Sequence, residues 1–325
     1  ALSHAVRQGI VDTLASASDD AEIAALVLIC RGRTFIAGAD IREFGKPLKD
    51  PWLPDVLARL EAMEKPTVAA LHGSVLGGGL ETAMCCHYRL AVPGTKLGLP
   101  EVKLGLLPGA GGTQRLPRLI GAARALGMMT GGNPIDAGAA QDWGLVDRLA
   151  AGDLLEAAIA YAEELIDEGA GPRRTGDLSV EAVSDDFFAE FRAGIARKAR
   201  GYESPWRIID CVEAAVSRPL EEGLAEERRL FLQCRDSDQS TAMRHLFFAE
   251  RAVARIPDVP RETPTRPIKR VGVIGAGTMG VGIALACLDA DLEVRLLDLD
   301  RDTLDQGRDR IADGLQKALA KGRID

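Results

Sequence analysis

The stretch that decides the fold is Gly77-Gly78-Gly79-Leu80-Glu81, which follows an apolar strand pattern at residues 67–71 and opens a helical pattern. A glycine run at a strand-to-helix turn lets the backbone approach a ligand closely, because no side chain stands in the way. Strand and helix patterns alternate through residue 150, which predicts an α/β layer fold whose ligands bind at such turns. The patterns predict strands over 25–30, 67–71 and 88–92, and helices over 4–17 and 80–87.

Two glutamates, Glu81 and Glu101, each lie beside glycines. Adding water across an activated double bond requires a base for the water and an acid for the α-carbon, and two carboxylates in different environments can divide these roles. The N–H groups of residues 77–79, at a helix N-terminus, can stabilise a developing oxyanion, and the loop over 34–40 can supply a second donor. Each feature also has a purely structural interpretation, since the helix dipole alone favours a glutamate in a first turn and a glycine triplet can be only a tight turn.

Four blocks of sequence, taken together and in this order, resemble the crotonase, or enoyl-CoA hydratase/isomerase, superfamily: residues 37–41, 65–73, 77–81 and 99–115. The resemblance implies a crotonase-type layered α/β domain over 1–171 that acts on an acyl-CoA thioester. It implies that Glu81 is the water-activating base and Glu101 the proton donor to the α-carbon. It also implies backbone groups around the substrate: oxyanion N–H donors at Ala39 and Gly78, and a CoA path along Ala37, Asp40 and Ile41.

The presence of both glutamates favours one reaction within that superfamily. Relatives specialised for double-bond isomerisation usually keep only the residue that corresponds to Glu101. We therefore expect an enoyl-CoA hydratase of fatty-acid beta-oxidation that adds water to a trans-2-enoyl-CoA. Two alternatives stay open: an enoyl-CoA isomerase, and a non-catalytic fragment that binds acyl-CoA or NAD.

A second motif lies towards the other end of the chain, where a strand pattern at residues 271–274 runs into Gly275-Ala276-Gly277-Thr278-Met279-Gly280. A second strand pattern, over residues 293–297, then ends in Asp298. Strand, G-x-G-x-x-G turn, helix and terminal acid together predict a Rossmann dinucleotide site. In such a site Gly275 makes the turn, Gly277 admits the pyrophosphate, Gly280 lets the helix pack, and an acid at Asp298 binds the ribose and favours NAD over NADP.

The order of the two motifs resembles the multifunctional fatty-acid oxidation enzymes, in which a hydratase half precedes an L-3-hydroxyacyl-CoA dehydrogenase half. By that resemblance Met279 and Asp298 match NAD-contact positions. Residues 172–264 carry helix-favouring stretches (180–199, 206–217, 220–232 and 241–256) and end in a proline-rich boundary, so we expect a helical linker there. We expect residues 265–325 to be only the first part of the NAD-binding domain, the first crotonase strands to be missing, and this chain to lack dehydrogenase turnover.

The resemblance leaves assembly and location less defined. Single-domain relatives form trimers, whereas linker helices of the multifunctional enzymes can cover the acyl-CoA site within one chain, and residues 172–264 favour the second arrangement. A thiolase is a candidate partner if the protein is bacterial. We expect a cytoplasmic location for a bacterial protein and a peroxisomal one for a eukaryotic protein.

Composition narrows the class of protein further. The chain has 325 residues, enough for roughly two domains, and its formal charge of −8 disfavours a nucleic-acid binder. The sequence shows no run approaching the ~20 apolar residues that a membrane span requires. The six cysteines form no C-x-x-C pair, which argues for a reducing compartment and against a zinc site.

Overall fold

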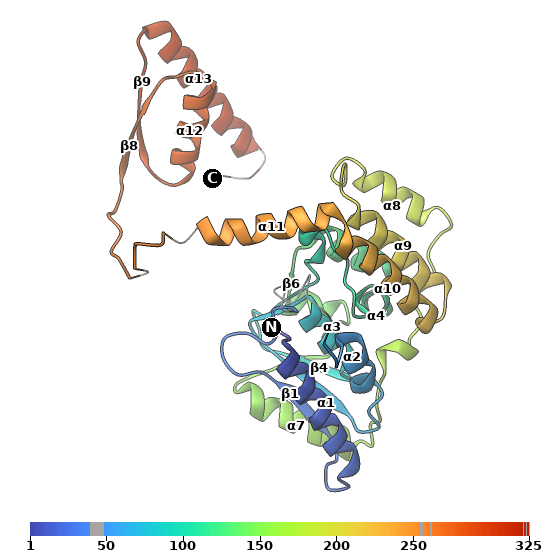
Figure 1. Ribbon diagram of the computed structural model, residues 1–325. Helices are drawn as coiled ribbons and strands as arrows, with labels where there is room; N and C mark the ends of the chain where they lie inside the picture. The colour runs from blue at the N-terminus through green and yellow to red at the C-terminus, as the bar shows by residue number, and fades with distance from the viewer. Residues whose placement is uncertain (40–48, 254–255, 261, 321, 323, 325) are drawn as a thin grey trace. The chain divides into compact units, whose positions relative to one another are not determined.

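A computed structural model of the protein describes residues 1–39, 49–253, 256–260, 262–320, 322 and 324. The chain forms two compact units, Ala1–Ala254 and Arg255–Asp325 (Figure 1). No helix among the described residues combines the length and the apolar character needed to cross a membrane.

A parallel four-stranded sheet lies at the centre of the first unit. Its order is β1 (Leu26–Ile29), β2 (Thr67–Leu71), β4 (Tyr88–Ala91) and β7 (Arg148–Leu149). Every residue of β2 is buried, as a central strand covered on both faces should be. The three strands predicted from the sequence are confirmed, with β2 matching at both ends and the other two shorter by one or two residues.

A smaller sheet carries the chain towards the glycine run. It consists of β3 (Ser74–Leu76), β5 (Lys96–Gly98) and β6 (Ile135–Asp136). β3 leads directly into helix α3, and β5 leads into the short 3₁₀ helix η2 that begins at Glu101. The remaining elements of this α/β part are α1 (His4–Asp19), α2 (Leu53–Glu61), α3 (Gly78–Cys85), η2 (Glu101–Leu104), α4 (Gly112–Ile120), α5 (Ala122–Gly131), α6 (Ala137–Asp142), α7 (Leu154–Asp167) and η3 (Thr175–Asp177).

The segment predicted to be a helical linker contains four α-helices among its described residues. These are α8 (Phe187–Ile195), α9 (Ser204–Ser217), α10 (Leu220–Asp236) and α11 (Asp238–Val253). Helix α8 is shorter than the predicted 180–199, since residues 181–184 have no regular structure, residues 185–186 form a turn and the chain turns again over 196–200. Helix α9 packs against α4, α5 and α10, so these helices belong to the same compact unit as the sheets.

The second unit is a single βαβ motif followed by a helix. β8 (Arg270–Ile274) pairs in parallel with β9 (Glu293–Leu297), and α12 (Thr278–Asp289) connects them. Helix α13 (Arg301–Ala320) packs against α12. This is the strand, turn, helix and strand that the glycine motif predicts.

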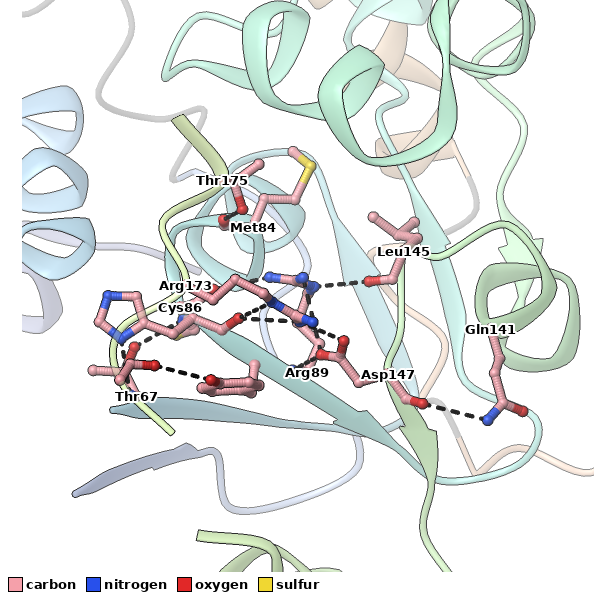
Figure 2. Close-up of polar contacts among 12 residues, drawn as sticks. Thr67, Met84, Cys86, Arg89, Gln141, Leu145, Asp147, Arg173 and Thr175 are labelled. Atoms are coloured by element: carbon pink, nitrogen blue, oxygen red, sulfur yellow. Dashed lines mark hydrogen bonds and ion pairs between the residues drawn. The ribbon is translucent and has the colours of Figure 1, made fainter. Parts of the chain in front are cut away.

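A buried arginine, Arg89, joins strand β4 to the loop that precedes β7 (Figure 2). Arg89, on β4, is 1 % exposed. Its Nε donates to the Leu145 carbonyl at 2.8 Å and its Nη1 donates to the Cys86 carbonyl at 2.8 Å. Its guanidinium lies 3.9 Å from the Asp147 carboxylate, which also accepts the Arg89 backbone N–H and pairs with Arg173. β4 is thereby joined to the loop that leads into β7.

We predict that Arg89→Met lowers the free energy of unfolding of the first unit by about 3–5 kcal/mol, the range for removing one partner from a buried ionic network. All three tryptophans, Trp52, Trp143 and Trp206, lie in this unit, so urea unfolding followed by tryptophan fluorescence reports on it. Arg148→Met is the control, because the Arg148–Glu164 pair is exposed and its loss leaves the midpoint unchanged. Equal urea midpoints for wild type and Arg89→Met would show that Arg89 does not stabilise the first unit.

Candidate active site

Glu81 occupies the first turn of α3, where the glycine run turns the chain from strand into helix. The side chain is 3 % exposed. Its Oε1 accepts backbone N–H groups from Ala110 at 2.8 Å and from Gly112 at 2.9 Å. Both donors belong to residues 109–113, here called the 109–113 turn, which leads into α4. The sequence predicts Glu81 beside a glycine triplet, and the structure adds a second glycine-rich turn on its other side.

Glu101 is the first residue of η2 and faces the start of α3. A Cβ placed on Gly77 would lie 2.7 Å from Oε1 of Glu101, so the carboxyl group rests against the glycine run. The Oε2 atom is buried and has no hydrogen-bond partner among the described residues. A buried carboxyl oxygen without a partner is costly as an anion, so this group is suited to carrying a proton.

The electrostatic environments of the two glutamates differ. Burial raises the pKa of Glu101 well above its ordinary value, and the nearby Glu81 charge raises it further. Burial also raises the pKa of Glu81, but the N–H groups of Ala110 and Gly112 and the Arg115 charge lower it. Hydrogen bonds donated to a carboxylate favour its charged form. The arrangement favours Glu81 as the base and Glu101 as the acid.

The two predicted oxyanion donors lie on neighbouring segments. Gly78 is the first residue of α3, where backbone N–H groups have no partner within the helix. The backbone nitrogen of Ala39 lies 3.5 Å from the position that a Cβ on Gly78 would take. The Leu2 N–H bonds to the Gly38 carbonyl at 3.0 Å, which holds this segment in place. Asp40 and Ile41, predicted on the CoA path, lie outside the described residues.

The close approach of these segments requires glycine at residue 79. A Cβ on Gly79 would lie 2.0 Å from the Ile36 carbonyl oxygen. No side chain can occupy that space, because the neighbouring atom is backbone and cannot rotate away. Gly79 therefore lets α3 lie directly against residues 36–39.

We predict that Gly79→Ala destabilises the first unit by about 1–3 kcal/mol, the usual cost of overpacking, and moves α3 away from residues 36–39. Gly9→Ala is the matched control. It lies inside α1 with nothing within 4 Å of an added Cβ, so we expect it to stabilise by about 0.5–1 kcal/mol. Both changes are measured by urea unfolding with tryptophan fluorescence. A Gly79→Ala variant as stable as wild type would show that α3 can shift without cost.

One cavity of about 1440 Å³ brings these groups together. Its wall includes Ala37, Ala39, Gly78, Glu81 and Glu101. The linker helices also contribute to the wall, and much of their contribution is basic. The basic lining residues of the whole cavity are His4, Arg7, Lys49, Lys103, Arg228, Arg235, Arg244 and Arg251, and its acidic lining residues are Glu81, Glu101, Asp236 and Glu250. A cavity in which basic residues outnumber acidic ones and two glutamates lie together is suited to an anionic ligand with a reactive centre.

Comparison with protein families agrees with this geometry. The family model described as "Enoyl-CoA hydratase/isomerase" matches residues 1–182. The chain belongs to the enoyl-CoA hydratase/isomerase family. A second model, "3-hydroxyacyl-CoA dehydrogenase, NAD binding domain", matches residues 270–325.

Several relatives of this chain align with it over both of these matched regions. The peroxisomal bifunctional enzyme of Cavia porcellus is 37% identical over 332 residues, covering 99% of this chain and 46% of that protein. The one from Danio rerio is 38% identical, with 98% of this chain and 45% of that protein covered. A glyoxysomal fatty acid beta-oxidation multifunctional protein of Brassica napus is 33% identical, with 93% and 44% covered. The chain thus spans less than half the length of each.

A solved structure supports the fold of this chain. The structure of Pseudomonas aeruginosa OdaA superposes with a TM-score of 0.55 at 21% identity, covering 76% of this chain and 89% of that one. At this identity the likeness shows the fold alone.

The second unit has the backbone features that a dinucleotide requires. Gly275 has φ of 101°, and a Cβ on Gly280 would lie 1.7 Å from the Gly275 carbonyl oxygen, so α12 packs on the turn only with glycine there. Gly277 has open space around it, and Met279 is 78% exposed. The Asp298 carboxylate accepts the N–H groups of Ala276 at 2.6 Å and Leu299 at 2.7 Å. These residues fit NAD, and their contacts with it stay a prediction.

Sequence reasoning missed a buried acidic residue beside the site, Glu227 on α10. It is 2 % exposed and interacts electrostatically with both Glu81 and Glu101. It lies in a highly charged stretch of sequence, so it cannot be distinguished there from glutamates that face solvent. A signal was nevertheless present in the helical spacing, because the buried residues of α10 are Gly223, Glu227, Leu230 and Cys234.

Proposed function

We propose that the first unit adds water to a trans-2-enoyl-CoA. The observation that carries the proposal is the pairing of two glutamates on one cavity wall. Glu81 is buried and accepts two backbone hydrogen bonds, whereas Glu101 is half-buried and its buried Oε2 has no hydrogen-bond partner among the described residues. Two such groups can act together as base and acid on one substrate. The family to which the chain belongs supports the same reaction.

The proposed mechanism begins with the thioester oxygen at the N–H groups of Ala39 and Gly78, which stabilise its developing negative charge. Glu81 takes a proton from water, and the water oxygen forms a bond to Cβ. The double-bond electrons move towards the thioester, giving an enolate. As the enolate collapses, Glu101 donates its proton to Cα. Proton exchange with solvent then restores both glutamates, so the product has gained one water molecule.

The rest of the chain supports substrate binding in this proposal. The basic side chains around the cavity complement the phosphates of CoA. We propose three functional segments: a hydratase domain over 1–171, a helical linker over 172–264 that closes the cavity, and the beginning of a dehydrogenase NAD-binding domain over 265–325. In the last segment NAD would bind at Gly275, Gly277, Met279, Gly280 and Asp298. When bound, NAD would serve as a hydride acceptor.

The biological setting follows from the relatives rather than from the site. Peroxisomal and glyoxysomal enzymes are among the proteins most similar to this chain, which favours a peroxisomal location if the source is eukaryotic. A bacterial cytoplasmic location and a thiolase partner stay predictions. The cavity lining contributed by α10 and α11 supports closure of the site within one chain.

We predict that Glu81→Gln and Glu101→Gln each lower the rate of crotonyl-CoA hydration by about 10²–10⁴-fold, because each removes a general acid or base. The rate is measured by the loss of absorbance of the conjugated thioester. Glu64→Gln is the control, since Glu64 is exposed and outside the cavity wall as described, and it should hydrate at the wild-type rate. If the folded wild-type chain leaves crotonyl-CoA unchanged, the proposed hydratase activity is rejected. Conversion of a 3-enoyl-CoA without hydration would favour isomerisation.

A further inference from the structure

Helix α10 reaches the 109–113 turn from the side opposite Glu81. Oε1 of Glu227 accepts the Gly111 N–H at 2.7 Å. Its Oε2 accepts the Thr113 N–H at 3.0 Å and the Thr113 hydroxyl at 2.5 Å. A side chain that lies 116 residues away from Gly111 in the sequence therefore binds the start of α4.

The two carboxylates divide the N–H groups of this turn in alternation. Ala110 and Gly112 donate to Glu81, whereas Gly111 and Thr113 donate to Glu227. Successive N–H groups therefore point in alternate directions, and each has an acceptor. The positive end of the α4 dipole favours both anions. Loss of either carboxylate leaves two buried donors without their acceptor and frees the turn to rotate.

Further contacts fix α10 against the same turn. The Gln114 side-chain amide donates to the Thr113 hydroxyl at 3.0 Å and to the Cys211 carbonyl on α9 at 2.9 Å. A Cβ on Gly223 would lie 2.0 Å from Oε1 of Gln114. At the other end of the turn, a Cβ on Gly109 would lie 2.3 Å from the Phe231 ring. Glycine at both positions lets the helix lie this close, so Glu227 reaches the turn from a fixed place.

The charge of Glu227 also acts on the glutamates of the site. Burial and the Glu81 charge raise the pKa of Glu227 to about 8. In turn the Glu227 charge raises the pKa of Glu101. The titratable groups that interact with Glu227 come from α3, η2, α4, α9 and α10: Glu81, Glu101, Arg115, Cys211 and Arg228.

We propose that Glu227 is a positioning residue for the catalytic pair: it holds the 109–113 turn so that the N–H groups of Ala110 and Gly112 meet Glu81, and it places a third carboxylate in the group that contains Glu101. Its catalytic meaning rests on the proposed hydration. The inference also assigns a role to the linker helices beyond covering the cavity, because the carboxylate that completes the turn comes from α10.

Glu227→Gln is the direct test. Glutamine keeps the shape, but its NH₂ group cannot accept the second N–H, and the charge is lost. Removing a negative neighbour lowers the pKa of Glu101, so Glu101 loses its proton at lower pH. We expect the alkaline limb of the kcat/KM profile for crotonyl-CoA to move to lower pH, and kcat to fall by up to about 100-fold through misplacement of Glu81. The neighbouring Glu226→Gln, whose carboxylate pairs with the exposed Arg229 and makes no hydrogen bond to the 109–113 turn among those described, should leave both unchanged.

A second readout does not depend on turnover. Carboxyl-¹³C glutamate labelling follows the titration of Glu101, whose signal is identified by its loss in Glu101→Gln. We expect a lower Glu101 pKa in Glu227→Gln and no change in Glu226→Gln. Thr113→Val gives a milder perturbation, because it removes only the hydroxyl donor. Without that donor Glu227 is neutral over more of the pH range, and the pKa of Glu101 should fall by a smaller amount.

The outcomes separate the inference from the proposed function. An unchanged Glu101 titration in both Glu227→Gln and Thr113→Val overturns the role of Glu227, even where hydration is rapid. A loss of kcat in Glu227→Gln with an unmoved alkaline limb also overturns it, since that is the result of a purely structural contact. If Glu227→Gln lowers the Glu101 pKa but the wild-type chain does not hydrate crotonyl-CoA, the effect of Glu227 on Glu101 stands and only the proposed reaction is rejected.

Discussion

The structure of the first unit depends on how the backbone N–H groups of residues 110–113 are shared. Glu81 from α3 accepts two of them and Glu227 from α10 accepts the other two. This interaction joins the α/β part, the helical linker and the start of α4 in one buried place. Because unpaired buried donors are costly, this sharing fixes the three parts in one geometry and holds Glu81 in the wall of the cavity.

A second constraint is the absence of side chains where backbone segments touch. Gly79 lies against the Ile36 carbonyl, and Gly112 lies against the Glu81 carboxylate. These glycines bring Ala39, Gly78 and the two glutamates to the wall of one cavity. The buried Glu61–Arg115 ion pair, with a shortest distance of 2.6 Å, holds α4 to α2. The arrangement around the cavity is thus supported by packing and by charge together.

Much of the fold could be predicted because its signals are local. The strand at 67–71, the glycine run and the glycine motif of the second unit can each be recognised from a few consecutive residues. Glu81 and Glu101 could be predicted as a pair for the same reason. Glu227 could not, since its carboxylate meets the 109–113 turn only through tertiary packing, and a charged run on a helix usually faces solvent. That linker helices cover the cavity is expected from the resemblance to the multifunctional enzymes, but the sequence does not show which residues of α10 and α11 line it, because the docking of helices depends on tertiary packing.

The central claim is that Glu81 and Glu101 together add the elements of water across a double bond. The most direct measurement is isotope incorporation into the product of an enoyl-CoA, by mass spectrometry and NMR. In D₂O the account predicts one deuterium at Cα, and in H₂¹⁸O it predicts one ¹⁸O at Cβ. Deuterium at Cα without ¹⁸O at Cβ, or neither label from a folded chain, would contradict it.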